Sequence, residues 1–191
     1  QEFFGISIEK PDVSNELIQF FHLTLAPIIE ELGFRVLLIG LPLFVLYSRK
    51  FSFKSLIKSL WRPLQNLHTV NLKSALLLIF IVGIFFGLLH IISGEPWSVG
   101  KFAQAASSGI IIGWVYFRFG LAPAILIHWA TNYFIFSYAY IIADINQISV
   151  ENVFTNSFLN ALEIILIVTG IISVIVMVLN YIFSKKYALN A

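Results

Sequence analysis

Five stretches of the sequence are apolar over a length that can cross a lipid bilayer. They cover about 17–48, 74–93, 100–118, 121–143 and 157–184. A spanning helix needs about 20 mostly apolar residues, and these runs are continuous rather than alternating, which argues against strands. Because 59% of the 191 residues are hydrophobic and 12% are charged, too few polar groups exist to cover a soluble globule. The sequence therefore predicts an all-α, polytopic transmembrane helix bundle of about five spans.

The first apolar stretch is longer than one crossing requires. As a straight helix it measures on the order of 45 Å at 1.5 Å per residue, so we expect it to tilt, or to bend near Pro27 and Pro42. We find no internal repeat or linker, so residues 1–191 are expected to form a single membrane domain. The chain has no cysteine, which removes disulfides, thiol nucleophiles and thiolate metal ligands from consideration.

The loop at about 49–73 carries six cations and no acid. These are Arg49, Lys50, Lys54, Lys58, Arg62 and Lys73. The positive-inside bias predicts that this loop is cytoplasmic, with the N-terminal side outside and the C-terminus inside. An alternative interpretation is an interfacial helix that binds anionic lipid or a partner. Its apolar side would carry Phe51, Phe53, Leu56, Leu60 and Trp61.

Three charges stand inside the first apolar stretch, in the segment "PIIEELGFRVLL". Ionisable groups at membrane depth usually face the bundle interior and either pair or act. Glu31 and Arg35 are four residues apart, so they lie on one helix face and can form an ion pair. Glu30 is rotated about 100° from that face. The pair does not account for Glu30, which makes it a candidate general base.

Polar side chains on two later spans are the candidate partners of Glu30. The second span contains His90, and the fourth contains His128 and Asn132, four residues apart on one face. An imidazole can hold or relay a proton near neutral pH, and an Asn amide can stabilise a developing oxyanion. Catalytic zinc sites often use two His and one Glu, so Glu30, His90 and His128 are also compatible with a metal. Zinc-helix, nucleophile-elbow and phosphate-loop motifs are absent from the sequence.

Together these residues resemble the CAAX-protease and bacteriocin-processing family of intramembrane peptidases, also called the ABI family. Its EExxxR motif appears as Glu30 to Arg35, its FxxxH motif as Phe86 to His90, and its HxxxN motif as His128 to Asn132. The three motifs occur in order on separate predicted helices, within about residues 17–143. The match is therefore more specific than any one motif alone.

The resemblance implies a helical bundle with a polar intramembrane cavity in which activated water attacks a peptide carbonyl. Glu30 would be the base, His90 would orient the water, and His128 with Asn132 would stabilise the oxyanion. Glu31 and Arg35 would support the site. The implied mechanism uses no cofactor and no metal, although a metal-dependent variant stays open.

The implied partners are a peptide or protein substrate, which can be lipidated, and membrane lipid, with no nucleic acid. Larger members of the family have about eight spans, so we expect up to three helices upstream of the five found here. A non-catalytic scaffold or binding subunit of a larger membrane complex is the alternative function.

One geometrical requirement follows from the predicted topology. His90 lies near the outer end of its span and His128 nearer the inner end of its own, whereas a shared water requires similar depth. Helix tilt, an early helix end or a recessed turn at "RFGLAP" would meet that requirement.

Overall fold

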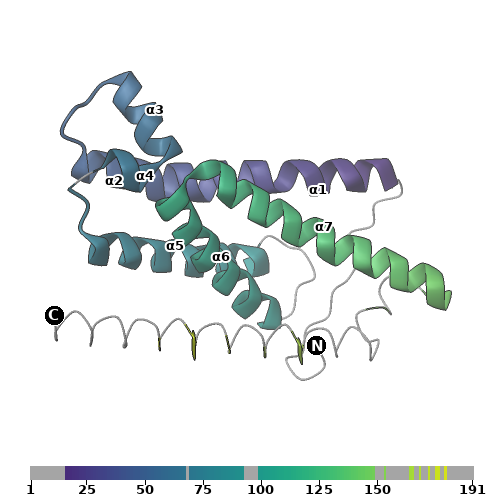
Figure 1. The fold of residues 1–191 in the computed structure, drawn as a ribbon. Coiled ribbons are helices and arrows are strands. Elements are labelled where there is room, and N and C mark those ends of the chain that lie inside the picture. Colours follow the sequence, from purple (N-terminus) through teal and green to yellow (C-terminus); the bar gives the residue numbers. More distant parts are fainter. Residues whose placement is uncertain are drawn as a thin grey trace.

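The computed structural model describes residues 16–67, 69–92 and 99–148. A few later positions are also described: Val153, Ile164, Ile165, Val168, Ile172, Ile175, Val176 and Leu179. The elements, in chain order, are α1 (Glu16–Glu30), the π-helix η2 (Glu31–Gly40), α2 (Leu41–Tyr47), α3 (Phe53–Trp61), α4 (Pro63–Asn66), α5 (Leu72–Ile92), α6 (Val99–Phe119) and α7 (Leu121–Asn146) (Figure 1). The predicted all-α class is confirmed for this part of the chain.

The first predicted span is helical from residue 16 to residue 47, but its middle is a π-helix. Pro27 lies inside α1 and Pro42 in the first turn of α2, so the irregular segment η2 falls between the two prolines. At its end the Leu41 N–H bonds to the carbonyl oxygen of Val36, five residues back. This spacing is the π-helical pattern, which often marks functional sites.

Two of the described helices, α5 and α7, are long and apolar enough to cross a membrane by length and composition. The fifth predicted span, 157–184, lies outside the described residues apart from single positions, so the five-span count stays a prediction. Large apolar side chains cover much of the outer surface, which suits contact with lipid. Examples are Phe20, Val45, Leu77, Phe80, Ile81, Leu126, Phe134 and Ile145.

Glycines allow α5 and α6 to pack closely. A Cβ atom on Gly83 would lie 2.9 Å from the backbone nitrogen of Ile110, and one on Gly87 would lie 2.8 Å from the carbonyl oxygen of Phe102. Gly109 faces the Gly83 backbone from α6. Small residues at such spacing are typical of helix contacts in membranes. These glycines therefore serve the packing of α5 against α6 within the chain.

The main core lies between η2, α2, α5, α6 and the start of α7. It is formed by Ile39, Leu43, Phe44, Leu67, Ala75, Ile79, Val82, Ile112, Tyr116, Phe117, Leu121 and Ala124. The C-terminal end of α2, the N-terminal end of α5 and the turn from α6 to α7 lie toward one end of the bundle (Figure 1). The loop at 49–73 belongs to that end.

Helices α3 and α4 form a corner over the turn between α6 and α7. The Tyr116 hydroxyl donates a hydrogen bond of 2.8 Å to the carbonyl oxygen of Leu60. Gly120 has a φ of 105°, and a Cβ there would lie 2.6 Å from the carbonyl oxygen of Trp61. Leu56 packs against the core. The predicted apolar side of this segment is thus divided, since Leu56 and Leu60 are partly buried and the aromatic residues are exposed.

The close approach of α5 and α6 can be tested with a single added methyl group. We expect Gly87→Ala to lower the free energy of unfolding by about 1–3 kcal/mol, because the new Cβ overlaps backbone atoms that cannot easily move. Denaturant titration of the purified protein in detergent measures this. Gly33→Ala is the matched control, since nothing lies within 4 Å of a Cβ there. Equal stability of Gly87→Ala and Gly33→Ala would contradict the packing argument.

Candidate functional site

The predicted site residues come from three parts of the fold that meet inside the bundle. Glu30 is the last residue of α1 and Glu31 the first of η2. His90 lies in the last turn of α5, and His128 lies in the second turn of α7. The junction between an α-helix and a π-helix therefore carries both acids, and α5 and α7 bring the imidazoles toward it.

Glu31 is completely buried and binds two partners. Its Oε2 lies 2.9 Å from Arg35 Nε, so the ion pair predicted from the four-residue spacing is present. This is a charge contact rather than an aligned hydrogen bond, because neither atom has a partner with hydrogen-bond geometry within the described residues. Its Oε1 accepts a 2.9 Å hydrogen bond from His128 Nδ1. Glu31 thus joins η2 to α7.

Arg35 is also fully buried, and its guanidinium lies over an aromatic ring. The Cζ atom is 5.0 Å from the centroid of Phe86 and 5.9 Å from that of Phe34. Nη1 and Nη2 have no hydrogen-bond partner in the part of the chain that the structure describes. A cation over an aromatic face is attracted by the ring electrons. Phe86 of α5 therefore helps to hold the charge that balances Glu31.

Glu30 faces the other nitrogen of the same imidazole. Its Oε2 is buried, has no hydrogen-bond partner among the described residues, and lies 3.7 Å from His128 Nε2. That distance is too long for a hydrogen bond. The Glu30 side chain is 31% exposed and that of His128 is 12% exposed. The carboxylate is thus held beside His128 while part of it stays accessible.

His90 is held by the helix that carries it. Its Nδ1–H donates a 2.8 Å hydrogen bond to the carbonyl oxygen of Phe86, one turn earlier. The Phe86 ring contacts both imidazoles, with centroid distances of 4.5 Å to His90 and 6.3 Å to His128. Since Nδ1 is occupied in each ring, Nε2 is the atom left for chemistry.

A recessed turn brings His128 beside Phe86, with ring centroids 6.3 Å apart. The turn between α6 and α7 lies further into the bundle than the end of α2 and the start of α5, and α7 then crosses the bundle obliquely (Figure 1). The corner of α3 and α4 covers this turn through the contact between Gly120 and Trp61. His128, only seven residues into α7, consequently reaches the level of Phe86 and His90.

Asn132 lies one turn beyond His128 on α7 and is partly buried. Among the described residues its side chain makes no hydrogen bond with Glu30 or His90, so its place in the site rests on the helix face that it shares with His128. The contacts that join α7 to α1 beside Asn132 were not predicted from the sequence. Trp129 Nε1 donates a 2.8 Å hydrogen bond to the carbonyl oxygen of Thr24, and the Thr24 and Tyr133 hydroxyls also bond.

Within the described residues, no group of three His, Asp or Glu side chains is arranged to hold a metal ion. The sequence was compatible with zinc binding by Glu30, His90 and His128. In the described structure these three residues do not form such a group. What the geometry does provide is a partly exposed glutamate beside His128, with His90 against the same Phe86 ring and a buried ion pair behind His128. That arrangement can take a proton from a water and return it.

An acid and histidine cluster inside the apolar helices that the structure describes is a candidate hydrolase site in a protein with two candidate membrane spans. Residues 14–134 match the family model of type II CAAX prenyl endopeptidase Rce1-like proteins. Because this match covers well over half of the chain, the protein belongs to that family, which confirms the resemblance seen in its motifs. No curated protein and no solved structure gives a match.

The buried ion pair can be tested by removing one or both of its members. We expect Glu31→Gln and Arg35→Met each to cost about 3–5 kcal/mol of stability, because each leaves a buried charge without its partner. The double variant should lose clearly less than the sum of the two, since neither charge then remains. Denaturant unfolding in detergent measures all three variants. Additive losses would show that the two charges do not depend on each other.

Proposed function

We propose that this chain is an intramembrane peptidase that hydrolyses a peptide bond with a water activated by Glu30. Membership of a CAAX protease family supports peptidase activity in general. The observation that carries the specific assignment is the state of Glu30. It is the one acid of the pair that keeps an exposed edge, and its Oε2 has no hydrogen bond within the described residues.

The proposed reaction begins with a water bound between Glu30 and His90 Nε2. Glu30 takes one proton, and the resulting hydroxide forms a bond to the carbonyl carbon of the substrate. The negative charge that develops on the carbonyl oxygen is stabilised by the Asn132 amide and by His128 Nε2 when that nitrogen carries a proton. The carbon–nitrogen bond then breaks. Glu30 returns its proton to the leaving amine and becomes a carboxylate again.

Glu31 and Arg35 act as positioning residues in this proposal. Glu31 accepts from His128 Nδ1, which directs Nε2 of the same ring toward Glu30 and the reacting carbonyl. Arg35 balances the charge of Glu31 inside the bundle. Such an acceptor behind an imidazole selects its tautomer and fixes its orientation. The pair therefore supports catalysis through His128 without touching the substrate.

The proposed substrate is a protein or peptide whose C-terminus is prenylated in a CAAX sequence, because the family is defined by that activity. A lipid attached to the substrate would bring the scissile bond to the membrane surface, where a partly exposed Glu30 can meet it. We further propose that the loop at 49–73 and the C-terminus are cytoplasmic and that Glu30 lies in a polar intramembrane cavity. Lys185 and Lys186, which support this orientation, lie outside the described residues.

The proposal is tested by cleavage of a farnesylated CAAX peptide by the purified protein in lipid vesicles. We expect Glu30→Gln and His90→Ala to lower kcat/KM by at least about 10²-fold, the usual contribution of a positioned base. Asn132→Ala should lower kcat by about 10²–10³-fold. Mass spectrometry of the released fragments measures the rate.

The matched control is Thr131→Ala, which changes an exposed neighbour of Asn132. It should keep the parental rate, and thermal unfolding should show that all four variants are folded. Cleavage by Glu30→Gln at the parental rate would overturn the assignment of the base. No cleavage by the parental protein, with the fold intact, would favour the scaffold or binding role over catalysis.

A further inference from the structure

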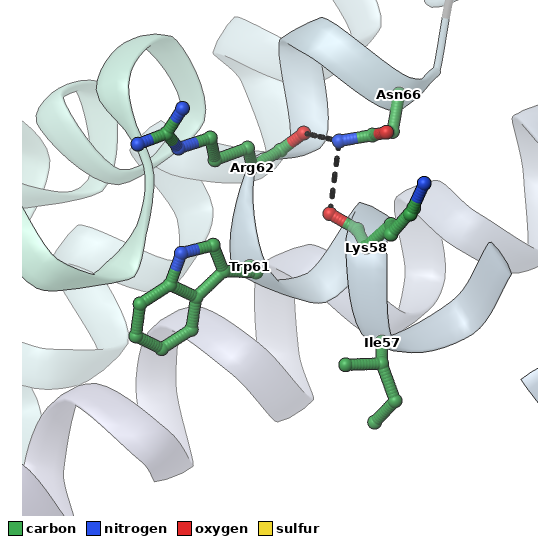
Figure 2. A pocket seen from close by; sticks show the side chains of 5 residues that line it. All are labelled: Ile57, Lys58, Trp61, Arg62 and Asn66. Carbon is green, nitrogen blue, oxygen red and sulfur yellow. Dashed lines mark hydrogen bonds between the residues drawn. The ribbon is translucent and has the colours of Figure 1, made fainter. Parts of the chain in front are cut away.

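The corner between α3 and α4 carries a pocket that the peptidase reaction does not use. It has a volume of about 340 Å³ and is lined by Ile57, Lys58, Trp61, Arg62 and Asn66. Figure 2 shows Trp61 and Arg62 on one side of the pocket and Lys58 on the other. All five residues come from the basic loop at 49–73.

The pocket is part of a stable corner rather than a flexible loop. Asn66 Nδ2 donates hydrogen bonds of 3.0 Å and 2.9 Å to the carbonyl oxygens of Lys58 and Arg62 (Figure 2). These carbonyls stand at the end of α3, where a helix leaves acceptors unpaired. The Ser52 hydroxyl accepts from the Ser55 N–H at the other end of α3, as an N-cap residue does.

Two stripes of opposite character run along the outer surface of α3. Phe53, Ile57 and Trp61 recur every fourth residue and are 80%, 50% and 49% exposed. Lys54, Lys58 and Arg62 follow one position later, so they form a parallel cationic stripe, also exposed. A helix with an apolar face beside a basic face is typical of proteins that lie in a membrane interface.

The charges of the cationic stripe are not neutralised by the protein. Residues 49–73 contain no acid, and within the described residues no carboxylate lies in ion-pair range of Lys54, Lys58 or Arg62. Arg62 has only a weak contact of 3.4 Å with the Gln65 side chain. A fixed positive field next to an exposed apolar stripe is complementary to an anionic lipid, whose headgroup and acyl chains meet at that depth.

We propose that this pocket binds the headgroup of an anionic phospholipid. Arg62 contacts the phosphate, which an Arg side chain can do with two parallel N–H bonds, and Lys58, whose side chain extends to the other side (Figure 2), adds its positive charge. Trp61 and Ile57 contact the glycerol and upper acyl region, where aromatic side chains favour the interface. A soluble acidic peptide would match the cations but not the exposed apolar stripe. Headgroup binding here is independent of the peptidase assignment.

Native mass spectrometry of the full chain in neutral detergent tests this site with phosphatidylglycerol and phosphatidylcholine of identical acyl chains. The parental protein should retain phosphatidylglycerol in preference to phosphatidylcholine. Lys58→Gln with Arg62→Gln should raise the apparent Kd for phosphatidylglycerol roughly 25-fold, since each cation near an anionic surface contributes about fivefold. Both side chains are exposed, so the fold should be unaffected.

The matched control is Lys50→Gln with Lys54→Gln, which removes the same charge from outside the pocket. It should change the Kd by less than about fivefold. Equal weakening in both double variants would overturn the pocket, leaving only a diffuse basic surface. Displacement of phosphatidylglycerol by an equal concentration of inorganic phosphate or hexaglutamate would overturn the lipid assignment in favour of a soluble anion.

Discussion

The buried carboxylate of Glu31 is the interaction on which the candidate site depends. A fully buried charge without partners costs several kcal/mol, so Glu31 requires both Arg35 and His128. Because His128 belongs to α7, this requirement fixes the position of α7 against η2. The same contact orients the second imidazole nitrogen toward Glu30. One desolvated acid therefore connects η2 with α7 and orients the imidazole that the proposed reaction uses.

Sequence patterns predicted the helices and the contacts between residues that are close together in the chain. The helical character of 16–47 and the ion pair of Glu31 with Arg35 both follow from spacing along one chain segment. The hydrogen bond from His128 to Glu31 was not predictable, because it joins residues 97 positions apart. Spacing along the chain therefore predicted the contact of Glu31 with Arg35 but not its contact with His128.

The structure also shows contacts of Phe86 that the sequence does not predict. In the sequence Phe86 is the first residue of the FxxxH motif. In the structure its ring contacts Arg35, His90 and His128. No spacing rule indicates that a phenylalanine will serve three polar groups, since this depends on how α5, η2 and α7 cross. The difference in depth between the two histidines was likewise explained only by the recessed turn at Gly120.

The π-helix η2 has a consequence for how this segment can change over time. Each residue of a helix sets the rotation of every residue after it, by about 100° in an α-helix. A single insertion or deletion between Glu31 and Gly40 would therefore turn Ile39, Leu43 and Phe44 out of the core. Side chains on its outer face can vary with little effect on packing, but the number of residues cannot. Apart from Glu31 and Arg35, the packing of this segment therefore depends more on its length than on the side chains of its outer face.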